Sequence, residues 1–286
     1  MNDQELVKKL QDAQLDLLRE LDRVCGILGI QYSVTYGTAI GALRHKGFIP
    51  WDDDVDVHML AEDLETLKQH KDLFRDKYFL QDSDSDPEYG LMITRLRNSE
   101  TTLVEDTETD RDINHGVFMD IYPMFNSPQG GFRFKRMLIA SRIYRLLLYA
   151  RVPVNHSIVV RAGAAFLLKV IPKGIRKSIR KRCWKTVSSC PHTGYRACFY
   201  SYGSAEWGVI PEKWLFPAVR TPFEDFETLI GPDMDAYLRF LSMFYGDYMQ
   251  LPPEEKRVFH HNYACVDLDK SYREYKGIAY CREKAE

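Results

Sequence analysis

The sequence has few of the features that mark secreted, membrane-spanning or disulfide-stabilised proteins. Six of its 286 residues are cysteine, which is too few for a disulfide scaffold and fits a reducing compartment. The N-terminal residues are polar and lack the apolar core of a signal peptide. The most apolar later run, residues 158–171, contains Arg161 and Lys169 and is shorter than the roughly 20 residues that span a bilayer. These absences favour a cytoplasmic protein.

Acidic residues are missing from a long part of the chain. Residues 121–205 contain no Asp or Glu but sixteen Lys and Arg, which leaves 23 basic and all 41 acidic residues for the remainder. The net charge of −2 therefore conceals a basic region within an acidic chain. Such a partition predicts an anionic partner for the basic region.

Apolar and basic residues interleave between residues 132 and 185. Basic amphipathic helices bind anionic membrane surfaces, and each Lys or Arg near the headgroups contributes about 1 kcal/mol. We expect this region to associate the protein peripherally with the cytoplasmic membrane. The alternative is a helical insertion whose basic face contacts the acidic core. Nucleic acid is not expected, because no nucleic-acid-binding motif accompanies the charge.

Residues 36–59 contain glycines, basic residues and aspartates close together, as phosphate-binding and metal-binding sites often do. Gly37 and Gly41 bracket an expected strand-to-helix turn, whose backbone amides and helix dipole can receive a phosphate. A basic triplet, residues 44–46, adds positive charge. The segment is therefore expected to bind a phosphate group.

Alternating Asp and Val residues end this segment. In a strand, successive side chains face opposite sides, so Asp54, Asp56 and His58 would share one face while Val55 and Val57 face a core. Carboxylates about 7 Å apart repel each other, and a divalent metal is a common remedy. The alternative is a solvated acidic turn.

Two further strands carry charged residues. Asp120 lies within the apolar run 117–121, where a carboxylate is costly unless it is paired or metal-bound. Beside Asp54 and Asp56 it would complete a three-carboxylate site. Arg95 and Arg97 share one strand face and can reach a substrate phosphate, although surface arginines are an equal alternative.

Elsewhere the apolar periodicity predicts helices over residues 2–28, 38–44 and 61–74 and strands over residues 32–36, 91–97, 102–105 and 115–123.

The run from Gly37 to Val57 resembles the signature of the LicD family. In this chain it reads Gly-Thr-x-x-Gly-Ala-x-Arg-His-x-Gly-Phe-Ile-Pro-Trp-Asp-Asp-Asp-Val-Asp-Val. Members of this family are phosphotransferases with a nucleotidyltransferase-like core that move phosphocholine from CDP-choline onto glycans. The related fukutin group moves ribitol phosphate from CDP-ribitol. The Asp-Ile-x-Pro element at residues 120–123 and the block that ends near residue 261 are also similar, whereas residues 126–205 are not.

The resemblance implies an α/β (α+β) protein with a nucleotidyltransferase-like mixed β-sheet flanked by helices. We expect residues 1–125 to hold the N-terminal helix and catalytic core and residues 126–205 to form a basic helical insertion. Residues 206–286 would complete the catalytic domain.

The resemblance also implies a metal-dependent phosphotransferase. Mg²⁺ or Mn²⁺ would be held by Asp54, Asp56 and Asp120, and Asp120 is the alternative general base. The donor would be a CDP-alcohol, foremost CDP-choline, and the acceptor a sugar of a lipid-linked or cell-surface glycan such as teichoic acid, lipopolysaccharide or capsule. The alternatives are a nucleotidyltransferase that acts on a protein or small molecule, and a non-enzymatic scaffold. The residues expected to bind the substrate are Gly37, Thr38, Arg44, His45, Lys46, Asp52, Arg95 and Arg97.

Two sets of metal-ligand residue types lie outside this pattern. Cys183, Cys190 and Cys198, with one nearby histidine, can bind structural zinc, but their spacing contains no Cys-x-x-Cys pair and packed free thiols are the alternative. His260 and His261 can act as ligands, although isolated histidines are more often surface or packed residues.

Overall fold

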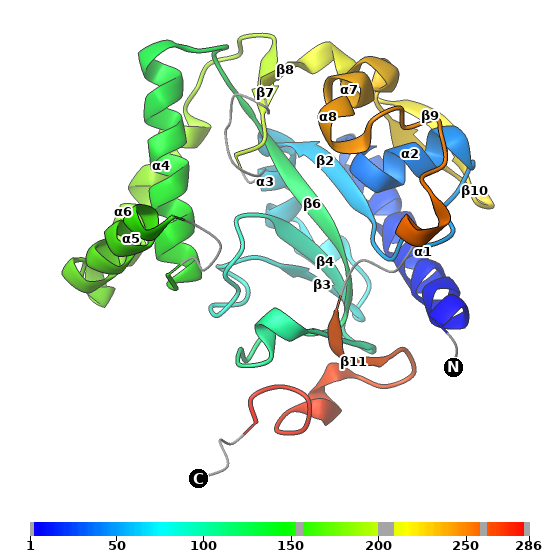
Figure 1. Cartoon of the computed structure of the whole chain (residues 1–286), viewed down its shortest axis with the longest axis horizontal. Coiled ribbons are helices and arrows are strands. Elements are labelled where there is room, and N and C mark those ends of the chain that lie inside the picture. The colour runs from blue at the N-terminus through cyan, green and yellow to red at the C-terminus, as the bar shows by residue number, and fades with distance from the viewer. Residues whose placement is uncertain (1–2, 153–156, 200–208, 258–261, 283–286) are drawn as a thin grey trace. The chain divides into compact units, whose positions relative to one another are not determined.

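The computed structural model places the chain in two compact units, each described here by itself (Figure 1). The first unit contains residues 1–81, 94–123 and 212–286, and the second contains residues 82–93 and 124–211. The structure describes residues 3–152, 157–199, 209–257 and 262–282.

A mixed β-sheet forms the centre of the first unit. Its described strands follow the order β3-β4-β6-β2-β1-β10-β9, and β6 continues into the second unit to pair with β7. The β1–β10 pair is parallel, whereas the β1–β2, β9–β10, β3–β4 and β4–β6 pairs are antiparallel. This confirms the predicted fold class. The strands are β1 Tyr32–Val34, β2 Asp56–Leu60, β3 Tyr78–Gln81, β4 Thr94–Asn98, β6 Val117–Asn126, β7 Tyr195–Ala197, β8 Val209–Pro211, β9 Val219–Phe223 and β10 Phe226–Ile230.

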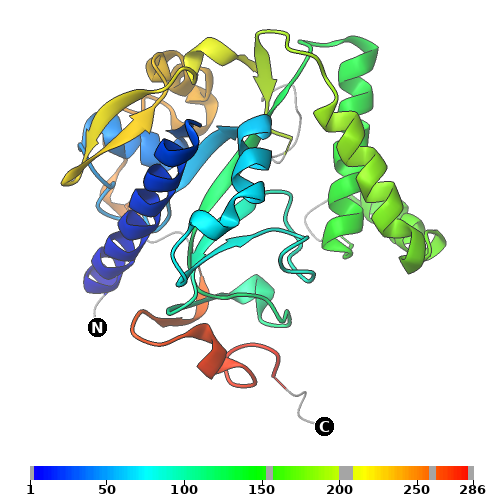
Figure 2. The same ribbon diagram turned by 180° about the vertical axis from the view of Figure 1, so that it is seen from behind.

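Helices cover both faces of this sheet. The long helix α1 (Asp3–Leu28) and α3 (Ala61–Gln69) lie on the face seen in Figure 2. Residues 10, 17, 18, 21 and 24 of α1 are fully buried, as their helical spacing predicts, and Gly29 ends the helix with a φ of 66°. The opposite face carries α2 (Tyr36–Arg44), α7 (Met234–Phe240) and α8 (Ser242–Tyr245).

A second, two-stranded sheet joins distant parts of the first unit. In it β5 (Thr102–Glu105) pairs with β11 (Tyr263–Asp267), and the 3₁₀ turn η2 (Asp106–Glu108) follows β5. The remaining 3₁₀ turns are η1 Lys71–Leu73, η4 Glu212–Trp214, η5 Glu254–Lys256 and η6 Tyr272–Tyr275.

Three helices dominate the second unit, namely α4 (Gly131–Tyr149), α5 (Ile158–Val170) and α6 (Lys173–Ser188). The rings of Tyr144 and Trp184 lie 5.4 Å apart and join α4 to α6. In the part of the chain that the structure describes, no helix is both long and apolar enough to cross a membrane.

Some predicted elements have different ends. The helix expected over residues 61–74 ends at Gln69, and the strand expected from residue 91 begins at Thr94. The strand expected over residues 32–36 ends at Val34, because Tyr36 adopts a φ of 48° and begins α2.

The close packing around Gly41 gives a stability prediction. A Cβ added there would lie 2.5 Å from the carbonyl oxygen of Gly47. We expect Gly41→Ala to lower the free energy of unfolding by about 1–3 kcal/mol through overpacking. Gly26→Ala in α1 is the matched control, because nothing lies within 4 Å of its added Cβ. The control should stabilise the helix by about 0.5–1 kcal/mol. Thermal unfolding checks both, and equal effects of the two substitutions would contradict the prediction.

Candidate active site

Strand β2 presents Asp56 to the site. Val57 and Met59 of this strand, and Val55 just before it, are completely buried, as predicted. Asp56 lies on the other face and opens the strand, whereas Asp54 precedes it. The expectation that both carboxylates share a strand face is therefore wrong. The β1–β2 pairing reaches back only to Val57, which leaves Asp54 in the preceding loop.

Asp56 is buried among other carboxylates. Its side chain is only 8% exposed, and its Oδ1 atom has no hydrogen-bond partner among the described residues. Burial, and then the charges of Asp54, Asp120 and Asp52, raise the pKa of Asp56 well above its ordinary value. Such a group requires a proton or a cation as a neighbour.

Strand β6 brings Asp120 to the same place. The backbone N–H of Asp120 donates to the carbonyl of Val55 over 2.9 Å, so Asp120 lies next to the Asp54–Asp56 segment. The three residues predicted as metal ligands are thus close in the fold, but among the described residues their oxygens do not form a group within 4.8 Å of one another. Their role as ligands stays a prediction.

The first turn of α2 borders these carboxylates. The Thr38 hydroxyl accepts a 2.9 Å hydrogen bond from the backbone N–H of Asp56, which fixes the helix start against β2. A Cβ at Gly37 would lie 2.7 Å from Oδ2 of Asp52. A larger residue at position 37 would therefore displace the Asp52 carboxylate, which lies where the partial positive charge of the helix start favours an anion.

The loop before β2 holds a second group of carboxylates. Among the described residues, Asp52, Asp53 and Asp54 form a group of potential metal ligands. One carboxylate oxygen of each lies within 4.8 Å of those of the other two. Asp53 is fully buried and accepts a 3.0 Å hydrogen bond from the Tyr263 hydroxyl. The Gln14 side chain donates to the Asp53 carbonyl over 2.6 Å. Long-range contacts therefore fix this loop.

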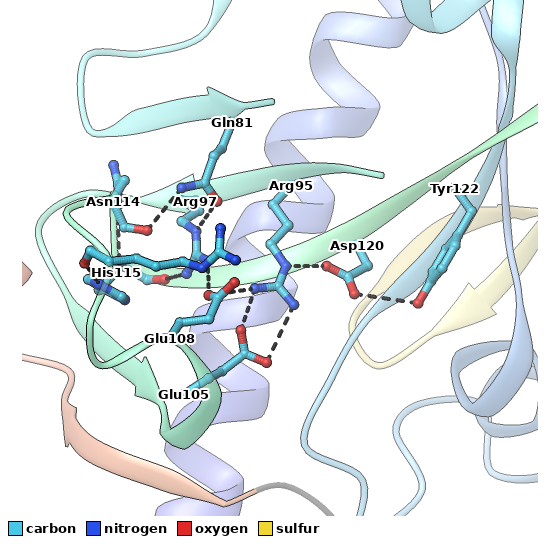
Figure 3. Close-up of polar contacts among 11 residues, drawn as sticks. Gln81, Arg95, Arg97, Glu105, Glu108, Asn114, His115, Asp120 and Tyr122 are labelled. Atoms are coloured by element: carbon cyan, nitrogen blue, oxygen red, sulfur yellow. Dashed lines mark hydrogen bonds and ion pairs between the residues drawn. The ribbon is translucent and has the colours of Figure 1, made fainter. Parts of the chain in front are cut away.

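Asp120 belongs to a buried network of ion pairs and hydrogen bonds (Figure 3). Nε of Arg95 donates to Oδ1 of Asp120 over 2.8 Å, and the same guanidinium also pairs with Glu105. The Tyr122 hydroxyl lies 3.4 Å from the other oxygen of Asp120. Burial raises the pKa of Asp120 and outweighs the opposing effect of Arg95. Asp120 is thus oriented by its neighbours and is a stronger base than an exposed aspartate.

The two glutamates of this network differ in acidity. Burial alone would raise the pKa of Glu105, but Arg95 and its hydrogen bonds lower it to about 2. Burial raises the pKa of Glu108. Glu105 therefore carries the charge that balances Arg95.

Arg97 does not reach the site. Its side chain has no exposed surface, and it donates to Gln81 over 2.6 Å and to the carbonyl of Gly116 over 2.8 Å. Arg97 is a structural residue in this geometry, against the substrate-binding role expected from the strand pattern. Arg95 is also almost fully buried and is bonded to Asp120 and Glu105.

Comparison with known proteins agrees with the motif. Residues 29–142 match the family model described as "LicD/FKTN/FKRP, nucleotidyltransferase domain". The chain is 28% identical over 268 residues to the lipopolysaccharide cholinephosphotransferase LicD of Haemophilus influenzae, covering 88% of this chain and 96% of that protein. Residues 29–142 are therefore similar to the LicD family, and most of the chain is similar to one cholinephosphotransferase of that name. An uncharacterised protein of Rickettsia prowazekii is 48% identical over 40 residues, which cover 14% of this chain and 15% of that protein. One of Rickettsia typhi is 50% identical over 34 residues, which cover 12% of this chain and 11% of that protein.

The basic triplet begins with Arg44, the last residue of α2, and continues into the loop that follows. Arg44 donates to the carbonyls of Tyr248 and Gln250 over 2.5 and 3.1 Å. Burial and the nearby Arg257 lower the pKa of Arg44. The His45 ring meets Trp51 edge-on, and Lys46 is exposed with a φ of 59°. The structure therefore uses Arg44 to hold the 248–250 loop.

Arg257 was not anticipated from the sequence. Its guanidinium lies 5.7 Å from the centre of the Trp51 ring and is close enough to Arg44 for repulsion. Two mutually repelling arginines favour a nearby anion. The position of Arg257, more than 200 residues after Arg44 in sequence, gives no local signal of this pairing.

Aromatic rings form the wall beside Asp56 and Asp120. His58 is buried, and its ring lies 5.2, 6.1 and 5.7 Å from the rings of Tyr36, Tyr122 and Tyr237. Burial lowers the pKa of His58 to about 3, so the imidazole is neutral. Tyr36 and Tyr122 are half-buried, and they remain partly open to a ligand. Their positions beside Gly37 and Asp120 in sequence are the signal that could have found them.

The histidines at 260 and 261 lie outside the described residues. Cys183, Cys190 and Cys198 are buried and form no disulfide with one another, and the described residues contain no group of potential metal ligands formed by them.

The buried charge of Asp56 predicts a conflict between function and stability. Because folding raises its pKa, the ionised side chain lowers stability as pH rises above the ordinary value of 3.8. We expect Asp56→Asn to melt at a higher temperature than the wild type at about pH 7 in chelator, and the gap to shrink toward about pH 4. Mg²⁺ should stabilise the wild type and not the variant.

The exposed Asp76 supplies the control. Asp76→Asn should change neither the melting temperature nor the response to Mg²⁺. An Asp56→Asn protein that melts well below the wild type at neutral pH would instead give Asp56 a structural role.

Proposed function

We propose that this chain transfers phosphocholine from CDP-choline to a sugar hydroxyl of a cell-surface glycan or its lipid-linked precursor and releases CMP. The observation that carries the proposal is a buried oxygen of Asp56 that has no hydrogen-bond partner among the described residues and lies among Asp54, Asp120 and Asp52. The near full-length similarity to the Haemophilus influenzae lipopolysaccharide cholinephosphotransferase supports the choice of transferred group and acceptor class.

The donor set at this site fits a hard divalent cation. Carboxylate oxygens are the ligands that Mg²⁺ and Mn²⁺ prefer, and the buried oxygen of Asp56 lacks a partner among the described residues. Asp54, Asp56 and Asp120 would hold the ion. When bound, it would neutralise the negative charge of the donor diphosphate and of these carboxylates.

The reaction is a displacement at phosphorus. The acceptor hydroxyl oxygen forms a bond to the phosphorus that carries choline, and the bond from that phosphorus to the bridging oxygen breaks. CMP leaves with the bridging oxygen and its electron pair. The hydroxyl proton passes to a carboxylate, and Asp120 is suited to accept it because burial raises its pKa. Arg95 and Tyr122 orient that carboxylate.

The start of α2 is suited to the donor phosphates. The backbone amides of Gly37 and Thr38 belong to its first turn, where the helix dipole favours anions. The carboxylate of Asp52 lies against this turn. We infer that it moves aside when the diphosphate binds. Arg44 and Arg257 supply further positive charge near Asp52.

The tyrosines beside the carboxylates favour choline over an uncharged alcohol. Aromatic faces attract quaternary ammonium groups, and Tyr36 and Tyr122 are both half-buried next to Asp56 and Asp120. Tyr245 on α8 is 36% exposed, and its partial burial, followed by the charges of Asp56 and Asp54, raises the pKa of its hydroxyl. A positively charged alcohol fits this acidic and aromatic surface.

A panel of donors tests the proposed reaction. We expect CMP release from CDP-choline with a suitable glycan acceptor, and much slower release from CDP-ethanolamine, CDP-glycerol and CDP-ribitol. Asp54→Asn, Asp56→Asn and Asp120→Asn should each lower the rate at least about a hundredfold. Asp76→Asn is the matched control and should keep the wild-type rate.

Two outcomes would change the proposed reaction or the residues assigned to it. Pyrophosphate release from a nucleoside triphosphate, without CMP release from any CDP-alcohol, would favour nucleotidyl transfer to a protein or small molecule. Full activity in any of the three carboxylate variants would remove that residue from the mechanism.

The ring of Tyr122 can be tested apart from its hydroxyl. If its face binds the ammonium group, Tyr122→Leu should raise the KM for CDP-choline about tenfold while changing the KM for CDP-glycerol little. Tyr122→Phe keeps the ring and removes only the hydroxyl contact to Asp120, so it should keep the KM for CDP-choline. Equal effects of Tyr122→Leu on both donors would contradict this assignment.

A further inference from the structure

Helix α5 exposes an apolar face. Of its 13 residues only Ala164 is buried, whereas Ile158, Val159, Phe166 and Val170 are 81%, 76%, 64% and 56% exposed. Large apolar side chains are normally buried, and a contiguous exposed group marks a surface that binds something.

The apolar side chains of α5 gather on one side. A period of 3.6 residues places Val159, Phe166 and Val170 on one face. By the same spacing Arg161 falls roughly opposite this face, and Lys169 lies at its edge. The apolar face is exposed, whereas Ala164 on another side of the helix is buried.

Positive charge accompanies this face. Helix α6 follows α5 directly and carries Lys173, Lys177 and Lys181 at four-residue spacing, all exposed. This spacing forms a single stripe along α6. Residues 121–205 contain no acidic residue, and the acidic residues of this unit that the structure describes lie within residues 82–88.

The exposed apolar face of α5 and the lysine stripe of α6 together favour an anionic membrane as the binding partner. A second copy of this chain, docked by the same surface in a two-fold dimer, would bring two basic surfaces together. An anionic bilayer offers both an apolar interior for the exposed face and negative headgroups for the lysines. At 13 residues, α5 is about 20 Å long and too short to span the roughly 30 Å hydrocarbon core. It is suited to lie within the interface.

We propose that α5 inserts its apolar face into the headgroup region of an anionic membrane, while the α6 lysines contact lipid phosphates. This goes beyond a general attraction of the basic region, because it assigns the insertion to Val159, Phe166 and Val170. It complements the proposed function, since a lipid-linked acceptor would lie at that surface, but it does not require the transfer reaction.

Vesicle flotation with the full chain tests the proposal. Vesicles of phosphatidylglycerol and phosphatidylcholine should bind the wild type, and vesicles of phosphatidylcholine alone should bind it far less. The double variant Val159→Ser, Phe166→Ser should lower the bound fraction at least about fivefold, by loss of buried apolar area. Ile278→Ser, at a 64% exposed apolar residue of the first unit, is the matched control and should bind normally.

Charge and insertion can be separated. Lys173→Gln, Lys177→Gln and Lys181→Gln together should weaken binding and reduce its salt dependence. In a Phe166→Trp protein, tryptophan fluorescence should shift to shorter wavelength on binding. Wild-type binding by the serine double variant, or no fluorescence shift, would overturn the insertion. Self-association that the serine substitutions abolish, without vesicle binding, would replace the membrane by a second copy.

The proposed transfer reaction and the proposed membrane binding can be contradicted independently of each other. If CMP release is absent while vesicle binding and its loss in the serine variant are as expected, the transfer reaction is wrong and the membrane surface stands. The serine variant should retain CMP release with a soluble acceptor.

Discussion

The burial of Asp56 among other carboxylates is the constraint on which the site depends. An ionised group that is 8% exposed, with Asp54, Asp52 and Asp120 nearby, is unfavourable by itself. The fold nevertheless holds it there with a backbone hydrogen bond to Thr38 and the pairing of β1 with β2. Active sites commonly retain such unfavourable groups because the function requires them.

The neighbouring ion network shows how the fold supports this arrangement. Arg95 lies between Asp120 and Glu105, so each charge of the sheet face has an opposite neighbour. Removing one partner of a buried pair is strongly destabilising. Asp120 is therefore both part of the candidate site and part of the structural network, whereas Asp56 is not neutralised in this way. This difference makes Asp56 the cleaner probe of function.

Local patterns predicted much of the fold and part of the site. Apolar alternation located β2, helical spacing located α1, and the Asp within an apolar strand located Asp120. These local patterns did not predict the contacts between residues far apart in the chain. The bond of Tyr263 to Asp53 joins residues 210 positions apart, and the burial of Arg97 depends on a neighbouring strand and Glu108. Spacing along the chain carries no signal for such contacts.

The central claim is that Asp56 is a metal ligand in a phosphotransferase site. Calorimetric titration of Mn²⁺ into the wild-type protein, repeated in buffers of different ionisation enthalpy, tests it most directly. Because burial and neighbouring carboxylates raise the pKa of Asp56, metal binding should release protons from it. The account predicts binding with proton release in the wild type and neither in Asp56→Asn. Equal Mn²⁺ binding by the two proteins would contradict it.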